Sequence, residues 1–170
     1  MTATAPALRI EPLSDPHDRE SFASGVEPLD RYLRQQAGQD ARRQVASCFV
    51  LVAGHDPAPI GYYTLAATSL ALAELPEALA KRLPRYPVVP ATLMGRLAVD
   101  ARRQGQGHGE LLLLDAFSRA LRNEIASYAF VVDAKDDKSA RFYRHHGFIP
   151  LVAGGRRLFV PMAEIAKLFA

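Results

Sequence analysis

The stretch that decides the fold runs from Leu97 to Leu121 and reads LAVDARRQGQGHGELLLLDAFSRAL. An apolar strand ends at Val99, a polar turn follows, and a helix with a broad apolar face begins near the last of three alternate glycines. Gly105, Gly107 and Gly109 remove side chains where backbone N–H groups converge at the helix N-terminus. The sequence therefore predicts an anion-binding turn between a strand and a helix.

The glycine spacing distinguishes this turn from two other phosphate-binding motifs. Dinucleotide-binding folds use G-x-G-x-x-G within a βαβ unit, whereas this chain has G-x-G-x-G and no N-terminal βαβ unit. The GK[ST] sequence of a P-loop is also missing from the turn. The alternative without function is a flexible loop between a strand and a helix.

Periodicity predicts alternating strands and helices in the remaining chain. We expect strands over Leu8–Leu13, Val45–Ala53, Ile60–Thr68, Thr92–Val99 and Ser127–Val132, and two short strands within Phe148–Pro161. We expect helices over Glu27–Asp40, Leu70–Leu83, Glu110–Leu121 and Lys135–His146, and a last one from Met162. This order predicts an α/β fold of the mixed α+β kind, with one mixed sheet, and the 170-residue length predicts a single domain over residues 1–170.

Composition narrows the function classes. The net charge is +3, and basic residues gather in clusters that either attract phosphate or form a solvated surface. These clusters are Lys81, Arg82 and Arg85; Arg102 and Arg103; Arg141 and Arg144; and Arg156 and Arg157. The only cysteine, Cys48, is interpreted as a small core residue. We expect no metal site because no zinc-ligand spacing occurs, and a cytoplasmic protein without a membrane span or signal peptide.

The second informative segment is Asp133–Phe148, in which a strand enters a short helix that Gly147 ends. Tyr143 lies on this helix and has two interpretations. It is either an amphipathic tyrosine with its hydroxyl at the surface, or a proton donor to a leaving thiolate. The residues alone favour neither.

Together these segments resemble the coenzyme A signature of the GCN5-related N-acetyltransferase (GNAT) family. The matching elements are Gln104-x-x-Gly107-x-Gly109 after a strand, then Ala140-x-Phe142-Tyr143 and Gly147-Phe148. The resemblance implies a mostly antiparallel central sheet flanked by helices and splayed at the coenzyme-binding strand. It implies that acetyl-CoA is the acyl donor and that Tyr143 is the general acid. The cofactor-binding residues that it implies are Leu97, Ala98, Val99, Arg102, Arg103, Gln104, Gly105, Gln106, Gly107, His108, Gly109, Asp137, Ala140 and Phe142.

Segments outside this signature are similar to the acetyltransferase toxins of bacterial toxin–antitoxin modules. They include Gly61-Tyr-Tyr-Thr-Leu65, Leu83-Pro-Arg-Tyr-Pro87 and Gly95-Arg-Leu-Ala-Val-Asp100. This resemblance implies acetylation of the α-amino group of aminoacyl-tRNA, which blocks translation, and neutralisation by a ribbon-helix-helix antitoxin. We expect Arg85 and Arg96 to bind substrate near the acceptor end, although an ion pair or a place at the core edge explains them equally well. We also expect a homodimer.

Two residues depart from the family pattern: His108 replaces a small aliphatic residue, and Asp137 replaces an asparagine. Two alternative functions stay open at this point. The first is a GNAT enzyme that acetylates a small amine or a protein N-terminus, and the second is a non-enzymatic acyl-CoA-binding or partner-binding module.

Overall fold

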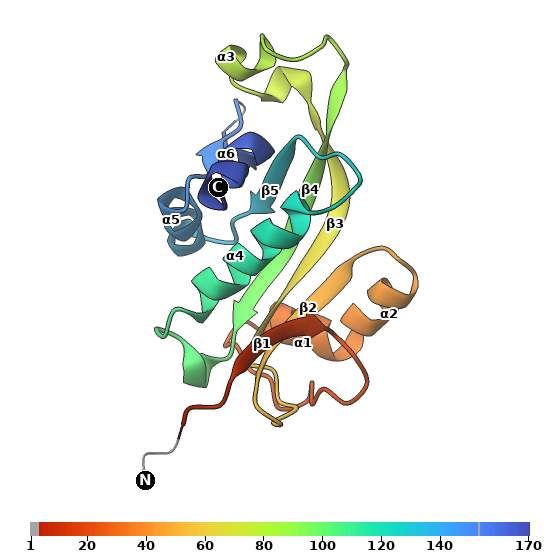
Figure 1. Cartoon of the computed structure of the whole chain (residues 1–170), viewed down its shortest axis with the longest axis vertical. Coiled ribbons are helices and arrows are strands. Elements are labelled where there is room, and N and C mark those ends of the chain that lie inside the picture. Colours follow the sequence, from red (N-terminus) through yellow and green to blue (C-terminus); the bar gives the residue numbers. More distant parts are fainter. Residues whose placement is uncertain (1–3, 153) are drawn as a thin grey trace. The chain divides into compact units, whose positions relative to one another are not determined.

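The computed structural model describes residues 4–152 and 154–170, and Figure 1 shows its elements. The strands are β1 (Leu8–Pro12), β2 (Ser47–Ala53), β3 (Gly61–Ala71), β4 (Val88–Val99), β5 (Ala129–Asp133), β6 (Ile149–Pro150) and β7 (Arg157–Pro161). The helices are α1 (Glu27–Gln35), α2 (Ala37–Arg42), α3 (Glu77–Ala80), α4 (His108–Leu121), α5 (Asp137–His145) and α6 (Met162–Leu168). Two short 3-10 turns complete the elements, η1 (Leu72–Glu74) and η2 (Ala101–Arg103).

The strands form one seven-stranded sheet in the order β1-β2-β3-β4-β5-β7-β6. Pairing is antiparallel between β1 and β2, β2 and β3, β5 and β7, and β6 and β7, whereas β4 pairs with β5 in parallel. The parallel register runs from Ala91↔Ala129 to Met94↔Val132, and β4 continues to Val99. A mixed, mostly antiparallel sheet flanked by helices confirms the predicted fold class.

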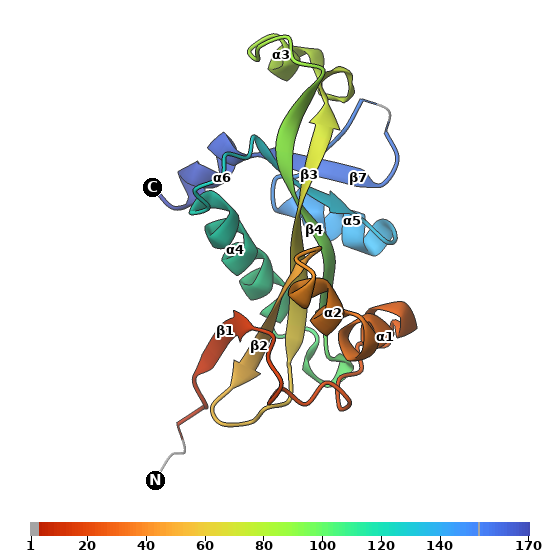
Figure 2. The same ribbon diagram turned by 90° about the vertical axis from the view of Figure 1, so that its right-hand side faces the viewer.

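The chain divides into two compact units. The first unit contains residues up to Leu65 together with Arg96–Ala116, and its core lies between the β1–β3 strands and helices α1 and α2. Leu33 from α1 and Val50 and Val52 from β2 are fully buried there. Phe22 packs edge-on against Tyr62, with ring centroids 5.6 Å apart. Figure 2 shows α1 and α2 beside these strands.

The second unit contains Ala66–Gly95 together with Phe117–Ala170. Three aromatic rings lie at its centre: Phe117 and Phe130 are edge to face at 5.0 Å, and Phe117 and Phe148 are stacked at 5.8 Å. A second apolar cluster includes Leu70 and Phe159, and both are fully buried. Aromatic pairs of this geometry stabilise a core by about 0.5–1.5 kcal/mol each beyond the area they bury.

Most predicted elements are confirmed within a few residues, but the helix over Leu70–Leu83 is wrong. Its first residues complete β3, a 3-10 turn follows, and α3 is only four residues long. Pro76 explains the break because it lacks an N–H donor and forces the preceding Leu75 into an extended conformation, with ψ of 146°. The leucine spacing indicated burial rather than helix, since Leu70 and Leu75 face the apolar core.

The predicted helix over Glu27–Asp40 is interrupted at Gln36, whose φ of −121° is not helical. The side chain of Gln36 donates to the Asp40 carboxylate at 2.8 Å and so connects α1 with α2. Within the described residues, no helix is long and apolar enough to cross a membrane.

Gly61 supplies a test of the packing in the first unit. A Cβ atom at Gly61 would lie 2.8 Å from the Ala98 carbonyl oxygen and 2.8 Å from Leu112 Cδ1. We therefore expect Gly61→Ala to lower the free energy of unfolding by about 1–3 kcal/mol, because a backbone oxygen must move. Urea unfolding followed by circular dichroism measures this change.

The matched control is Gly38→Ala, a helical site at which the added methyl meets only the flexible ends of Arg19 and Arg42. We expect this variant to be unchanged or stabilised by up to about 1 kcal/mol. An equal loss of stability in both variants would refute the packing argument.

Candidate functional site

The glycine-rich turn of the first unit has the backbone conformation of an anion-binding turn. Gly105 and Gly107 have φ of 78° and 83°, a left-handed region that disfavours other residues. Helix α4 begins at His108, and the Leu111 N–H donates to the Gly107 carbonyl at 3.1 Å. The first N–H groups of α4 therefore have no acceptor within the helix, and they carry its positive partial charge.

The space around the Cβ positions of Gly105 and Gly107 is open. A Cβ atom at Gly105 or Gly107 would meet no other described atom within 4 Å. These two glycines are therefore required by their φ angles and not by close contact with other parts of the chain. The arrangement can hold an anion such as a pyrophosphate against converging backbone N–H groups.

A buried carboxylate fixes the start of this turn. Asp100 directly follows β4, and its side chain is 2% exposed. It accepts hydrogen bonds from the Ala23 N–H at 3.2 Å, from the Arg102 N–H at 2.9 Å and from the Arg102 guanidinium at 3.0 Å. The Arg102 guanidinium and these N–H groups lower the pKa of Asp100 to about 2.

The side chains of Gln104 and Arg102, both predicted to bind cofactor, form hydrogen bonds to other segments of the chain. The Gln104 amide donates to the carbonyl oxygens of Ser24 and Val99, each at 3.0 Å. The Arg102 guanidinium also reaches the Ser21 carbonyl at 3.3 Å. These side chains hold the turn in place, which leaves its backbone N–H groups for an anion. Arg103 and Gln106 are exposed.

His108 lies at the start of α4 and is 9% exposed. Its Nε2 atom is buried and has no hydrogen-bond partner among the described residues. A buried polar atom without a partner lowers the free energy of unfolding by about 1–3 kcal/mol, so His108 is less favourable at this position than an aliphatic residue. Gly109, the next residue, is partly buried.

The three strand residues predicted to bind pantetheine lie at the end of β4, beyond the last pair of its register with β5. Ala98 is buried, whereas Leu97 and Val99 are partly exposed. The Val99 carbonyl accepts from Gln104, and the N–H of Asp100 donates to the Ile60 carbonyl at 2.8 Å. The strand end is thus held in position by residues of the first unit.

Tyr143 belongs to the second unit and lies on α5. Its ring is edge to face with Phe142 and with Phe148, at 5.3 Å in each case. The side chain is largely buried, which is compatible with both interpretations of Tyr143. Burial alone raises the pKa of Tyr143 well above its usual value of 10.0, so the hydroxyl stays protonated at neutral pH.

The other residues of α5 that were predicted to bind the cofactor differ in burial and in contacts. Asp136, not Asp137, caps the helix by accepting from the Ser139 N–H at 2.8 Å. Asp137 is exposed and pairs with Arg156 at 3.2 Å. Ala140 and Phe142 are partly buried.

The two predicted substrate-binding arginines differ in their surroundings. Arg85 is exposed in the second unit. Arg96, in the first unit, lies over the Tyr32 ring with its guanidinium carbon 3.5 Å from the ring centroid. Tyr32 in turn donates to Asp40 at 2.8 Å. Arg96 therefore has a protein partner at the core edge.

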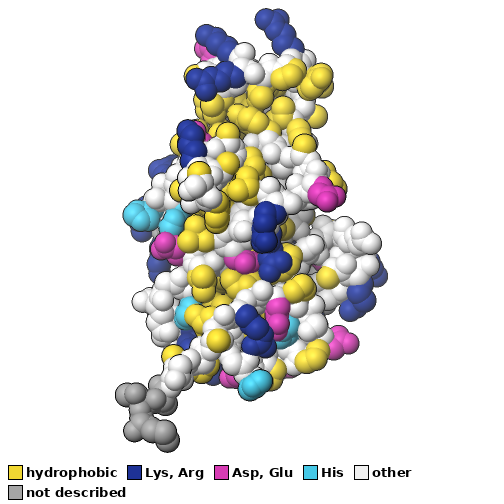
Figure 3. Space-filling model, in the orientation of Figure 1, with side chains coloured by type: hydrophobic (Ala, Val, Ile, Leu, Met, Phe, Trp, Pro, Cys, Tyr) yellow, Lys and Arg dark blue, Asp and Glu magenta, His cyan; other side chains and the backbone are white. Residues whose placement is uncertain are grey.

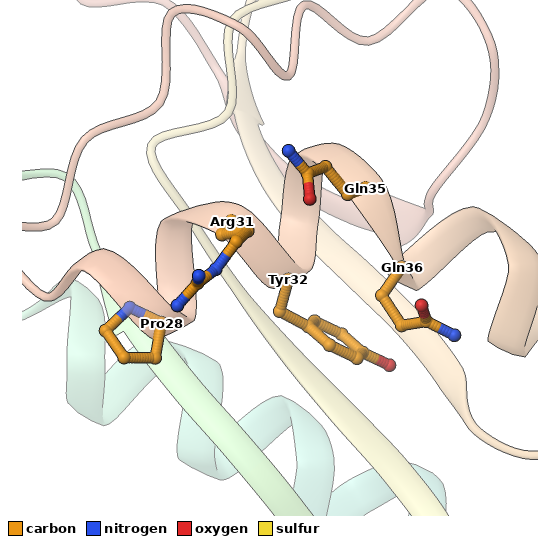
Figure 4. Close-up of a pocket in the computed structure, with 5 residues that line it drawn as sticks. All are labelled: Pro28, Arg31, Tyr32, Gln35 and Gln36. Atoms are coloured by element: carbon orange, nitrogen blue, oxygen red, sulfur yellow. The ribbon is translucent and has the colours of Figure 1, made fainter.

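A pocket of about 270 Å³ opens beside this pair on α1. Figure 4 shows its lining side chains, which are Pro28, Arg31, Tyr32, Gln35 and Gln36. The sequence analysis did not identify this pocket. It also missed the contacts of Ser24 and Ala23 with the turn. Asp100 at the strand end is a common capping residue and was the one signal that could have suggested the contact with Ala23. Among the described residues, no group of His, Cys, Asp and Glu side chains could hold a metal ion.

The lowered pKa of Asp100 predicts a pH-dependent contribution to stability. The folded-state pKa of about 2 lies below the usual 3.8, so the stabilisation is present above pH 4 and is lost as the pH falls toward 2. We expect Asp100→Asn to lower the free energy of unfolding by about 2 kcal/mol at pH 7, and its difference from the parent to shrink in acid.

Denaturant unfolding at pH 7, 4 and 3 measures this difference. Asp15→Asn is the control, because the Asp15 side chain is fully exposed and its ion pair with Arg19 is long, at 3.9 Å. A difference between Asp100→Asn and the parent that does not change with pH would contradict the ionic contribution.

The unpartnered Nε2 of His108 predicts a stabilising substitution. We expect His108→Leu to raise the free energy of unfolding by about 1 kcal/mol, because the apolar side chain leaves no buried polar atom unsatisfied. His145→Leu, at an exposed position of α5, is the control and should have little effect. Thermal melts of the three proteins test the prediction, which fails if His108→Leu melts below the parent.

Comparison with known proteins places this site in a family. The model of the acetyltransferase (GNAT) domain matches residues 46–150, which is more than half of the chain. A tRNA-acetylating toxin of Mycobacterium tuberculosis (strain ATCC 25618 / H37Rv) is 38% identical over 138 residues, covering 80% of this chain and 81% of the toxin.

Two solved structures are also similar. The AtaT toxin complexed with acetyl-methionyl-tRNAfMet is 32% identical, with a TM-score of 0.89, and the match covers 96% of this chain and 100% of that one. A tyrosine-to-phenylalanine mutant of AtaT bound to acetyl-CoA and the C-terminus of the antitoxin AtaR is 29% identical, with a TM-score of 0.78, over 96% of this chain and 98% of that one. With its glycine-rich turn between β4 and α4, the chain belongs to the GNAT acetyltransferase family.

Proposed function

We propose that this protein transfers the acetyl group of acetyl-CoA to the α-amino group of aminoacyl-tRNA and so inhibits translation. The observation that carries the proposal is the 38% identity to a tRNA-acetylating toxin over most of both chains. The AtaT toxin, which is similar along nearly its whole length, has been solved with acetyl-methionyl-tRNA. The glycine-rich turn supports the choice of acyl donor, since it suits the pyrophosphate of coenzyme A.

The chain's own residues have distinct roles toward acetyl-CoA in this proposal. Backbone N–H groups from Gly105 to Gly109 bind the pyrophosphate, and the backbone of Leu97–Val99 binds the pantetheine. The side chains of Asp100 and Gln104 hold the turn. Arg103 and Gln106 are exposed beside it and contribute to phosphate binding. Asp137, Ala140 and Phe142 on α5 border the coenzyme in the same proposal.

In the reaction, the neutral amine attacks the thioester carbonyl, a C–N bond forms and the C–S bond breaks. Tyr143 gives its hydroxyl proton to the departing sulfur. The nitrogen loses one proton to solvent as the amide forms, and solvent returns a proton to the Tyr143 oxygen. Its raised pKa keeps the proton available, and the same apolar surroundings also raise the pKa of a thiol. Negative charge develops on the sulfur as the C–S bond breaks, and the Tyr143 proton moves to the sulfur in that step.

The proposal also covers the binding partners of the protein and its location in the cell. An AtaT mutant has been solved with the C-terminus of its antitoxin, and this supports an antitoxin for the present chain. We assign that antitoxin to the ribbon-helix-helix class and the enzyme to the cytoplasm. Residues 1–170 act as one acetyltransferase domain, without a metal, in a homodimer.

Labelled acetyl-CoA tests the function directly. The acceptors are a mixed pool of charged tRNA, deacylated tRNA and simple polyamines. Label on charged tRNA alone supports the proposal, and sorting by amino acid then gives the specificity. Label on polyamines would favour a small-amine acetyltransferase, and label on no acceptor would favour a non-enzymatic acyl-CoA-binding module.

Tyr143→Phe tests the proton donor. We expect kcat to fall about 10²- to 10⁴-fold, with little change in the KM for acetyl-CoA, because only the proton is removed. Steady-state acetylation of charged tRNA measures both constants. Tyr128→Phe is the control, since Tyr128 is partly buried in the same unit and has no assigned role. Equal rates in the Tyr143 variant and the parent would eliminate Tyr143 as the acid.

A further inference from the structure

The segment that follows α3 in the second unit exposes basic and aromatic side chains. We define the α3 tip as Lys81, Arg82, Arg85 and Tyr86, all of which are exposed. Figure 3 shows Lys and Arg side chains gathered over the end of the unit where α3 lies. Beneath the tip, Leu79 and Leu83 pack against the apolar cluster around Leu75 and Val89. These two partly buried leucines fix the segment, and its polar residues are exposed.

Two of the three cations at the α3 tip are not neutralised. Lys81 pairs with Glu77 at 3.3 Å. The guanidinium groups of Arg82 and Arg85 have neither an ion pair nor a hydrogen bond within residues 4–152 and 154–170. Both are therefore available to an external anion, and a planar guanidinium suits phosphate in particular.

Tyr86 lies beside these arginines on a rigid backbone. The residue is 63% exposed, which is unusual for so large an aromatic residue. Its N–H donates to the Pro84 carbonyl at 2.8 Å, and the Pro87 carbonyl accepts from the Leu72 N–H at 3.0 Å. The two prolines also restrict the backbone on either side of Tyr86. The backbone at Tyr86 therefore loses little freedom when a planar group stacks on the exposed ring.

We infer that the α3 tip binds the unpaired 3′ end of the acceptor RNA, with Tyr86 stacking on a base and Arg82 and Arg85 contacting phosphates. This inference rests on the proposed function, in which the reacting amino group is carried on that end. Single-stranded RNA is recognised by exposed aromatic faces next to basic side chains, which is the combination present here. An acidic peptide would use the two arginines but would give the solvent-facing ring no equivalent partner.

Direct RNA binding tests the inference without any catalytic step. The probes are a tRNA transcript with its unpaired 3′ end and the same transcript without its last three nucleotides. Filter binding at several salt concentrations is measured for the parent protein, Tyr86→Leu, Tyr86→Phe, Arg82→Gln and Arg85→Gln. Arg43→Gln is the matched charge control, because Arg43 is exposed at the end of α2 and has no assigned role.

We expect the parent to bind the intact transcript more tightly than the trimmed one. Tyr86→Leu should weaken binding of the intact transcript roughly 5- to 150-fold, the range for one stacked base, and should not affect the trimmed one. Tyr86→Phe should match the parent within about twofold because it keeps the ring. Arg82→Gln and Arg85→Gln should each reduce the slope of log Kd against log salt concentration by about 0.7. Arg43→Gln should leave this slope and the preference for the intact transcript unchanged.

Three results would overturn the inference. The first is a parent protein that does not distinguish the two transcripts. The second is Tyr86→Leu binding the intact transcript like the parent. The third is normal RNA binding by the tip variants together with loss of their neutralisation by a co-expressed antitoxin, which would assign the α3 tip to a peptide. Thermal melts and the KM for acetyl-CoA, unchanged in the variants, exclude a general effect on folding.

Acetyl transfer to charged tRNA separates this inference from the proposed function. If the parent protein acetylates charged tRNA but the tip variants bind both transcripts normally, the function stands and the α3 tip is not its RNA-binding surface. If the parent acetylates no charged tRNA but prefers the intact transcript through Tyr86, the α3 tip binds RNA and the reaction has been assigned wrongly.

Discussion

The glycine-rich turn depends on one buried carboxylate, that of Asp100. Gly105 and Gly107 adopt left-handed conformations and lose more conformational entropy on folding than other residues, so the turn does not order itself. Asp100 supplies an anchor because it receives two backbone N–H groups and the Arg102 guanidinium in a place that water hardly reaches. The folded conformation of the turn therefore depends on the ionised form of this carboxylate. The conformationally free glycines of the turn thus follow a carboxylate that is fixed in position.

Hydrogen bonds at the turn also join segments that are far apart in the chain. Gln104 donates to the carbonyl of Ser24, which is 80 residues earlier, and Ala101 donates to the Ala23 carbonyl at 2.8 Å. Ser24 is itself tied to α1, because its hydroxyl donates to Asp30 at 2.6 Å. Helix α1, which lines the pocket beside Tyr32, and the glycine-rich turn are thus linked by a continuous series of hydrogen bonds within the first unit.

Local rules were sufficient for the strand, turn and helix around the glycines, because φ angles and apolar periodicity are properties of neighbouring residues. They failed at Leu70–Leu83, where leucines at helical spacing are buried by a strand end and two short turns separated by Pro76. They also could not locate the partners of Gln104 and Arg96. A glutamine and an arginine in a phosphate-binding context suggest ligand contacts, whereas their observed partners, Ser24 and Tyr32, are distant in sequence. The prediction of Tyr143 as the general acid rests on a family resemblance, and its packing against Phe142 and Phe148 could be seen only in the fold.

Cys48 is the only cysteine in the chain, and its burial has a practical consequence. With a pKa of about 12, almost none of its sulfur is thiolate at neutral pH, and maleimides or iodoacetamides react with the thiolate. A cysteine introduced at an exposed position would therefore be the one readily labelled thiol in the folded protein. The natural chain can accept a single fluorophore or spin label at a chosen position without replacement of its own cysteine.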